Sequence, residues 1–208
     1  MTDAKTRALT VISAGLTQPS SSRLLADRLA AATVDALAER GVAAAVEVVE
    51  LRDHAHALVD NLLTGFPSGA LRAVTERVAV SDGLIAVTPI FNASYSGLYK
   101  SFFDVLEPGT LDGVPVLLGA TGGTARHSLA LEHAVRPMFA YLRAAVVPTA
   151  VYAASEDWAG SGDHGPARRI ARAGAELAEA MSSRENAGPV DPFANSVPFE
   201  KLLAQQAE

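Results

Sequence analysis

A run of four apolar residues at positions 84–87 constrains the fold of this chain more than any other feature. The run, Leu-Ile-Ala-Val, shows no alternation of polar and apolar side chains. A strand of this kind is buried on both faces, as in a parallel sheet covered by helices on each side. Pro89 lacks the backbone N–H that a sheet ladder uses, so we expect this strand to end at Thr88.

The rest of the chain alternates apolar strand patterns with helical patterns. A chain of 208 residues fits one ordinary domain, which we expect to span residues 1–183. The alternation predicts an α/β fold with a doubly wound, five-stranded parallel sheet in the order 2-1-3-4-5. The other expected strands cover residues 8–13, 44–51, 114–120 and 146–153, and the expected helices cover 22–40, 68–82, 97–106, 125–145 and 165–183.

Three further segments carry specific expectations. Residues 53–63 predict a loop with a partial helical turn. Pro137 lies inside the helical pattern of 125–145, and an interior proline removes a backbone hydrogen bond, so we expect a distortion between about His133 and Pro137. The last residues, 184–208, contain three prolines and several apolar side chains without a core of their own. We expect this tail to dock on its own subunit or on a partner subunit.

Composition excludes several classes of function. The net charge is −6 and the arginines are scattered, which argues against nucleic-acid binding. Without cysteine the chain has no disulfide, thiolate metal site or catalytic thiol. No leader or long apolar span is evident, so we expect a cytoplasmic protein without a membrane association. Asp53, His54 and His56 could suggest a metal, but two such histidines without a further ligand favour solvated side chains, and we predict no metal site.

Three loops follow the carboxyl ends of the predicted strands nearest the point where the strand order reverses. The first, residues 14–23, leads into a helix with three consecutive serines and an arginine, a layout that suits phosphate; one serine would serve as the helix cap in any case. The second, residues 89–96, offers Phe91, Asn92 and Tyr95. The third is the Thr-Gly-Gly-Thr segment 121–124, whose glycines allow close approach of a planar ring, although this segment taken alone favours a tight turn. The first loop suits a phosphate group and the other two suit a planar ring. A single ligand with a phosphate at one end and an aromatic ring at the other is FMN, which we therefore predict.

The same loops carry a family resemblance. The stretches SAGLTQPSSSR (13–23), DGLIAVTPIFNASYSGLYKSFFD (82–104) and LDGVPVLLGATGGTARHSLALEHAVRPMFAYLRA (111–144) resemble the flavodoxin-like NAD(P)H-dependent FMN reductases. The similarity is greatest to the reductase components of two-component flavin monooxygenases of the alkanesulfonate type. One departure is Phe91, where many relatives have tyrosine; the change keeps ring contact and removes a hydroxyl.

The resemblance implies the residues of an FMN site. The implied phosphate group is Ser13, Thr17, Ser20, Ser21, Ser22 and Arg23. The implied ring contacts are Pro89, Ile90, Phe91, Asn92, Tyr95 and Ser96 on one side and Thr121, Gly122, Gly123 and Thr124 at the pyrimidine edge. It also implies a homodimer or homotetramer with a π-helical bulge near His133, which we interpret as an ordinary interface side chain.

We therefore hypothesise an NAD(P)H:FMN oxidoreductase that transfers a hydride from NADPH or NADH to N5 of FMN and supplies reduced flavin to a monooxygenase. The flavin carries the hydride chemistry, so no side chain is predicted to be catalytic. Two alternatives stay open: an enzyme that retains FMN and reduces quinones, azo dyes or metal oxyanions, and a flavodoxin-like electron carrier that does not use NAD(P)H. Arg126 and His127 could meet the 2′-phosphate of NADPH, yet the nucleotide preference cannot be read from the sequence.

Overall fold

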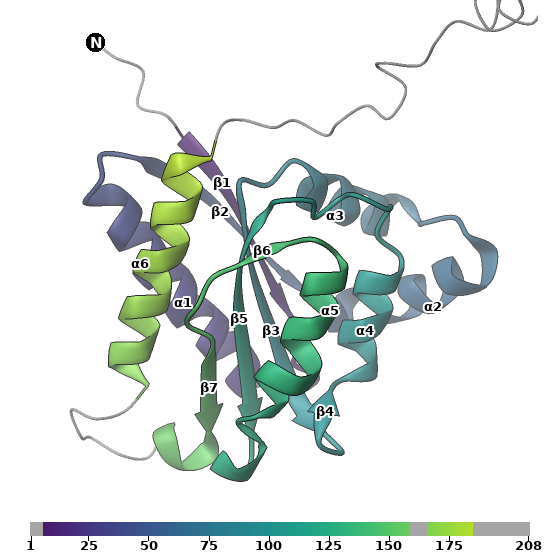
Figure 1. Cartoon of the computed structure of the whole chain (residues 1–208). Coiled ribbons are helices and arrows are strands. Elements are labelled where there is room, and N and C mark those ends of the chain that lie inside the picture. Colours follow the sequence, from purple (N-terminus) through teal and green to yellow (C-terminus); the bar gives the residue numbers. More distant parts are fainter. Residues whose placement is uncertain (1–5, 159–165, 185–208) are drawn as a thin grey trace, which may run out of the picture.

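The computed structural model describes residues 6–158 and 166–184 and has one sheet with helices on both faces (Figure 1). The main path of the sheet is β2-β1-β3-β5-β6; β7 also pairs with β5, and β4 pairs with β3. All pairings are parallel except β3 with β4. The strands are β1 (Thr6–Ser13), β2 (Ala43–Glu50), β3 (Gly83–Phe91), β4 (Ser94–Tyr95), β5 (Pro115–Gly122), β6 (Ala145–Val146) and β7 (Val151–Ala154).

The doubly wound α/β fold and the strand order are confirmed, but the number of strands is seven and not five. The expected fifth strand is divided into β6 and β7, which both pair with β5. Pro148 lies in the interruption, and a residue without an N–H cannot continue a ladder. The additional strand β4 is the short return of a hairpin that begins in β3.

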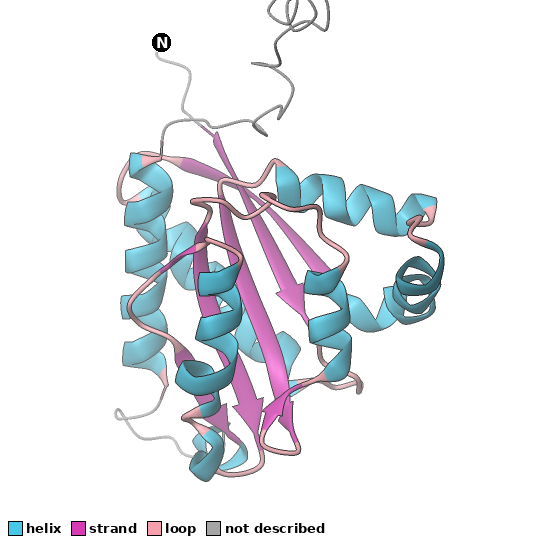
Figure 2. Cartoon of the chain, turned by 45° about the vertical axis from the view of Figure 1, so that its right-hand side comes forward, coloured by secondary structure: helices cyan, strands magenta, loops and turns pink. Residues whose placement is uncertain are grey.

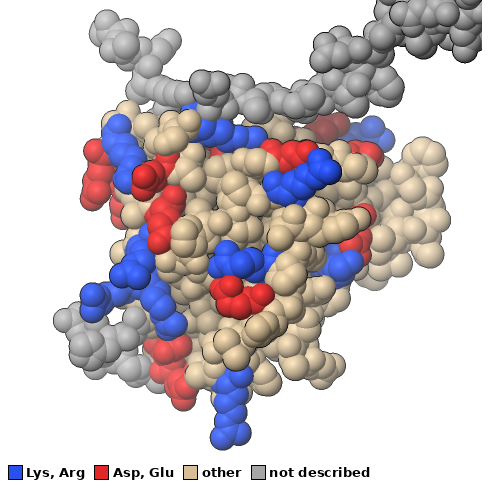
Figure 3. Space-filling model, in the orientation of Figure 1, with Lys and Arg blue, Asp and Glu red and all other residues tan. Residues whose placement is uncertain are grey.

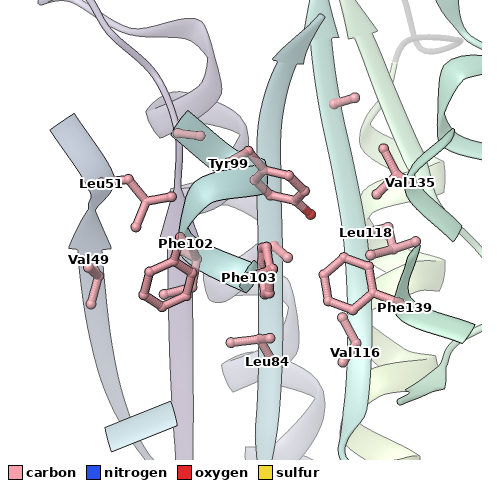
Figure 4. Close-up of a cluster of buried hydrophobic side chains, with 14 of the residues drawn as sticks. Val49, Leu51, Leu84, Tyr99, Phe102, Phe103, Val116, Leu118, Val135 and Phe139 are labelled. Atoms are coloured by element: carbon pink, nitrogen blue, oxygen red, sulfur yellow. The ribbon is translucent and has the colours of Figure 1, made fainter. Parts of the chain in front are cut away.

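The apolar run of β3 is the centre of the fold. Leu84, Ile85, Ala86 and Val87 are all fully buried. Leu84 and Ala86 belong to the hydrophobic cluster on one face of the sheet, while Ile85 and Val87 belong to the cluster on the other. Figure 4 shows the first cluster, in which Leu84 lies among aromatic side chains of the helical layer. Helices on both faces explain why the run does not alternate.

Helices cover both faces of the sheet (Figures 1 and 2). On one face α1 packs directly on α6 at Gly174, where an added Cβ would lie 2.8 Å from the carbonyl carbon of Ala32. This close approach requires a glycine. The pair is α1 (Ser21–Ala38) and α6 (Ala167–Ser183), and the opposite layer holds α2 (Ala55–Thr64), α3 (Gly69–Ala79), α4 (Gly97–Asp104) and α5 (Arg136–Tyr141).

Pro89 does not end its strand, contrary to the sequence-based expectation. Strand β3 continues to Phe91, and Pro89 pairs with Thr121 of β5. The pairing of β3 with β1 ends at Val87, so Pro89 lies where β3 has lost one of its two neighbours in the main sheet. A missing N–H is tolerated at such an edge position.

The helical expectations are mostly confirmed, with two corrections. Residues 53–63 were expected to be a loop with a partial helical turn, but they belong largely to the ten-residue helix α2, whose Leu58 is fully buried. Residues 125–145 do not form one helix: a 3-10 turn at Ala125–His127 and a π-helix at Leu131–Val135 precede α5. The expected distortion is therefore present, beginning two residues earlier than the predicted His133.

The predicted tail, apart from Arg184, lies outside the described residues. In the described part of the chain, none of the helices has the length and apolar character needed to cross a membrane.

Candidate active site

The three predicted loops meet at one edge of the sheet, where the arrowheads of β3, β5 and β7 lie in Figure 1. They surround a cavity of about 250 Å³. Of the residues implied by the resemblance, the cavity is lined by Thr17, Ser20, Ser21, Ser22, Pro89, Ile90, Phe91, Thr121, Gly122 and Gly123. Ser13, Arg23, Asn92, Tyr95, Ser96 and Thr124 lie in the same loops but do not line it.

The three consecutive serines of the first loop differ in burial and in hydrogen bonding. Ser20 is the N-cap of α1, and its Oγ accepts a hydrogen bond from the Arg23 N–H at 3.2 Å. Ser22 is buried and shares a 2.8 Å hydrogen bond with the Thr121 hydroxyl, which links the first loop to the third. Ser21 is exposed at the first position of the helix. The start of an 18-residue helix thus opens on the cavity with its N–H donors and positive dipole end.

Two details show that this loop is shaped for a close ligand. At Gly15 an added Cβ would lie 2.0 Å from Ser20 Oγ, so the backbone approaches the cap more closely than any side chain permits. The Ser13 hydroxyl at the end of β1 is fully buried and has no hydrogen-bond partner among the described residues. A buried polar group without a partner is costly unless a ligand or water satisfies it. The donor set therefore fits an anionic phosphate group.

Arg23 points away from the cavity that the serines line. Its guanidinium donates to Asp27 at 2.8 Å and to Glu50 at 2.8 Å, and it borders a second, open cavity beside the first loop. The hydrogen bond that Arg23 donates to Asp27 is the largest influence that raises the pKa of Arg23 above its usual value. Its predicted contact with phosphate stays a prediction.

The second loop is fixed by short-range hydrogen bonds. Thr88 Oγ1 accepts from the Ser96 N–H at 3.1 Å, and Ser96 caps α4 by accepting from the Tyr99 N–H at 3.2 Å. Between them, Ile90 and Phe91 pair with Tyr95 and Ser94 in the hairpin of β3 and β4. Phe91 lines the cavity with 47% of its surface exposed, so its ring is accessible to a planar ligand.

The third loop is supported by Tyr152 of β7. The Tyr152 hydroxyl donates to the Thr124 carbonyl at 2.7 Å, and an added Cβ at Gly122 would lie 2.1 Å from that hydroxyl. Gly122 is therefore needed for the position of Tyr152. Burial, followed by the charge of Asp157, raises the pKa of Tyr152, so the phenol stays protonated as a donor at neutral pH.

Four cavity residues were not predicted: Gly15, Leu16, Ser155 and Trp158. Gly15 and Leu16 belong to the first predicted loop. Ser155 and Trp158 follow β7, and the rule that ligands bind at the carboxyl ends of strands could have found them.

A sequence model of the NADPH-dependent FMN reductase family matches residues 8–159, which include all the cavity residues. The chain belongs to this family. It is therefore an oxidoreductase that uses FMN and NAD(P)H, and the predicted family is confirmed. The described residues contain no group of three or more His, Asp or Glu side chains that could hold a metal ion.

Individual relatives agree with this placement. An FMN reductase (NADPH) of Pseudomonas aeruginosa is 36% identical over 149 residues, covering 71% of this chain and 76% of the relative. Among solved structures, an oxidoreductase from Corynebacterium diphtheriae is 43% identical with a TM-score of 0.84, covering 88% of this chain and 100% of the other. An NADH:FMN oxidoreductase (EMOB), in its apo form, is 27% identical with a TM-score of 0.73 and coverages of 88% and 94%.

The fold is shared more widely. A flavodoxin, WrbA-like protein from Agrobacterium tumefaciens is 14% identical with a TM-score of 0.52, covering 86% of this chain and 96% of the other. At this identity the likeness shows the flavodoxin-like fold alone.

Proposed function

We propose that FMN occupies the cavity with its phosphate at the first loop and its ring between the second and third loops. The observation that carries this proposal is the convergence of a helix N-terminus, an exposed phenylalanine and two glycines on one cavity. The unpartnered Ser13 hydroxyl at the same edge supports the phosphate end. Phe91 would lie against the ring, and the backbone at Gly122 and Gly123 would face its pyrimidine edge.

Bound FMN would accept a hydride at N5 from NADPH or NADH. The chain's part in this step is orientation, because none of the described residues that line the cavity is a histidine, aspartate, glutamate or lysine that could act as an acid or base. Backbone N–H groups of the third loop would donate to the carbonyl oxygens of the ring and would stabilise negative charge that accumulates there.

We further propose that reduced FMN leaves the site and serves a flavin-dependent monooxygenase. Gly123 and Phe91, which border the cavity on its ring side, are exposed, so the flavin would be held at the surface and not enclosed. The family resemblance to reductases of two-component systems supports the same role. A carrier that docks by an acidic face is disfavoured, because acidic and basic side chains are interspersed on the face shown in Figure 3.

We also propose that the protein is a homodimer or homotetramer. Exposed apolar side chains gather on α2 and the residue that follows the turn after it, namely Val59, Leu62, Leu63 and Phe66. Such a group is typical of a surface that another chain covers. His133, on the exposed side of the π-helix, is proposed as an interface side chain.

The decisive experiment is steady-state oxidation of NADPH and NADH with FMN, FAD and riboflavin as acceptors. We expect FMN-dependent oxidation and a clear preference for FMN over riboflavin, which lacks the phosphate. Release of reduced flavin is tested by adding a flavin-dependent monooxygenase across a dialysis membrane, and product formation there supports free diffusion. Equal rates with FMN and riboflavin would contradict the phosphate assignment.

A further inference from the structure

Trp158 is the only tryptophan of the chain, and it forms a wall of the cavity that no predicted loop supplies. It ends the 3-10 turn Ser155–Trp158 that follows β7. The residue lines the cavity together with Ser155, on the side where the first turn of α1 also contributes Ser21 and Ser22.

The position of the indole is fixed from two directions. Asp157 Oδ2 accepts a hydrogen bond from the Ala154 N–H at 2.8 Å, which holds the turn against the end of β7. On the other side the Arg28 guanidinium lies over the ring, with its central carbon 4.7 Å from the ring centroid. The remaining ring surface packs on the hydrophobic cluster shared by α1 and α6. A surface tryptophan without a function would not need this many supports.

The indole N–H is the unusual part of this arrangement. It is buried and has no hydrogen-bond partner among the residues that the structure describes. A tryptophan N–H is a donor only, and a buried tryptophan normally finds an acceptor. The cost of desolvating this donor is recovered only where an acceptor atom reaches it.

We propose that the Trp158 N–H donates a hydrogen bond to the phosphate end of bound FMN, and that Arg28 is the positioning residue that holds the ring. The inference rests on the proposed placement of FMN in this cavity. Arg28 lies on the same helix as Ser21 and Ser22, and both serines line the cavity together with Trp158. The ring contacts at Phe91 and Gly123 come from other strands.

The test compares FMN and riboflavin binding to Trp158→Phe, measured as dissociation constants by flavin fluorescence. The variant keeps an aromatic ring, but it replaces the two-ring indole by a single ring without the donor. We expect the FMN dissociation constant to rise about tenfold, as for a hydrogen bond to a charged acceptor, and the riboflavin constant to change less than about twofold. Tyr141→Phe is the matched control, because it removes the polar group of a highly exposed aromatic residue outside the cavity. It should leave both constants unchanged.

Thermal unfolding of the ligand-free protein separates this role from a structural one. Because Trp158→Phe removes a buried donor without a partner, the melting temperature without FMN should stay constant or rise. Arg28→Gln should weaken FMN binding partially, and Arg28→Lys, which keeps a cation over the ring, should restore it. Equal weakening of FMN and riboflavin, or FMN binding within twofold of the wild type, overturns the inference.

A further variant distinguishes failure of this inference from failure of the proposed function. Phe91→Ala changes a cavity residue far from α1 in the chain and should weaken FMN and riboflavin alike. If Phe91→Ala weakens both ligands and Trp158→Phe affects neither, the Trp158 contact is wrong and the FMN site stands. If neither variant has an effect, FMN binds elsewhere and both proposals are wrong.

Discussion

The two ends of the sheet differ in how a large buried polar side chain finds its hydrogen-bond partners. At the amino end, the fully buried Arg7 donates to Asp82 at 2.7 Å, and the second oxygen of Asp82 accepts from the Ala8 N–H at 2.8 Å. Arg7 also donates to the carbonyl of Arg184, at the end of α6. At the carboxyl end, the Ser13 hydroxyl and the Trp158 N–H have no partner among the described residues.

This difference predicts that the amino end of the sheet contributes mainly to the stability of the fold and the carboxyl end mainly to ligand binding. Partners within the chain stabilise the amino end, where Arg7 joins three segments distant in sequence through one ion pair and one hydrogen bond. Donors and acceptors without partners at the carboxyl end lower the stability of the free protein and leave it able to gain from a ligand. Changes at the amino end should therefore affect unfolding, and changes at the carboxyl end should affect FMN binding more than unfolding.

The largest effect is expected for Asp82→Ala. The change leaves the Arg7 guanidinium buried without its carboxylate, so the free energy of unfolding should fall by about 3 kcal/mol. Urea unfolding measures the loss, and the FMN dissociation constant of the folded variant should be unchanged. Asp53→Ala, at an exposed carboxylate, is the control and should alter stability by less than about 0.5 kcal/mol. If Asp82→Ala left the stability unchanged and weakened FMN binding, the amino end of the sheet would not have the purely stabilising role predicted for it.

The next effect is expected at the third loop. Gly122→Ala places a Cβ 2.1 Å from the Tyr152 hydroxyl, so the hydrogen bond to the Thr124 carbonyl must break and the loop must shift. We expect FMN binding to weaken at least tenfold, with a loss of stability of about 1–2 kcal/mol. Gly123→Ala is a matched control, because no atom lies within 4 Å of its added Cβ.

A double-mutant cycle identifies the cause of the Gly122 effect. Tyr152→Phe removes the hydroxyl that the new Cβ would meet, so Gly122→Ala should cost less stability in the Tyr152→Phe background than in the wild type. Equal costs in both backgrounds would show that the contact with Tyr152 is not responsible.

A smaller effect is expected for Ser22→Ala, which removes the hydrogen bond between the first and third loops. The free energy of unfolding should fall by about 1 kcal/mol, because the buried Thr121 hydroxyl loses its partner. Denaturant titration measures this loss. Ser21→Ala, at an exposed serine one position earlier, should leave stability nearly unchanged. If the two variants unfold alike, the bond between the loops contributes nothing.

The smallest effect concerns Glu132 on the π-helix. Its hydrogen bond from Arg136, with the charges of Arg136 and His133, lowers the pKa of this carboxyl below its ordinary value of 4.5, against the opposing effect of burial. A lowered pKa in the folded state means that the contribution to stability is full above pH 4.5 and is lost as the pH falls through the lowered value. Because Glu132 is half exposed, the effect should be a few tenths of a kcal/mol. Melting temperatures of the wild type and of Glu132→Gln, measured against pH, test this. The variant should lose less stability at acid pH than the wild type, and an equal loss in both proteins would contradict the prediction.

The sequence was sufficient for the parts of the fold that depend on local patterns. The apolar run of β3, the serine cap of α1 and the break before Pro137 each have a local physical cause, and each was predicted. The division of the last strand and the length of α2 were missed, because they depend on which neighbours are available for pairing and packing. Long-range ion pairs could not be predicted from the sequence either. Nothing near Arg23 in the sequence indicates that Glu50, at the end of β2, lies beside it.

The three loops of the candidate site were predicted from the sequence, but the cavity residues that follow β7 were not. Three loops were found by their residue types, whereas Trp158 was missed because aromatic residues after a strand are common and its unpartnered N–H is visible only in three dimensions. Roles of single residues, such as the phosphate contacts of Ser13 and Ser21, stay predictions for the binding experiments to decide.

The hairpin between β3 and β4 has one more consequence. Its two central residues, Asn92 and Ala93, have φ values of +49° and +68°, a left-handed backbone that costs about 1 kcal/mol for alanine. Folding of the chain supplies that energy through the two pairs of the hairpin. On the proposed placement of FMN, an arriving flavin would meet a hairpin whose backbone pairing is already formed, so that little conformational entropy would be lost at this loop on association.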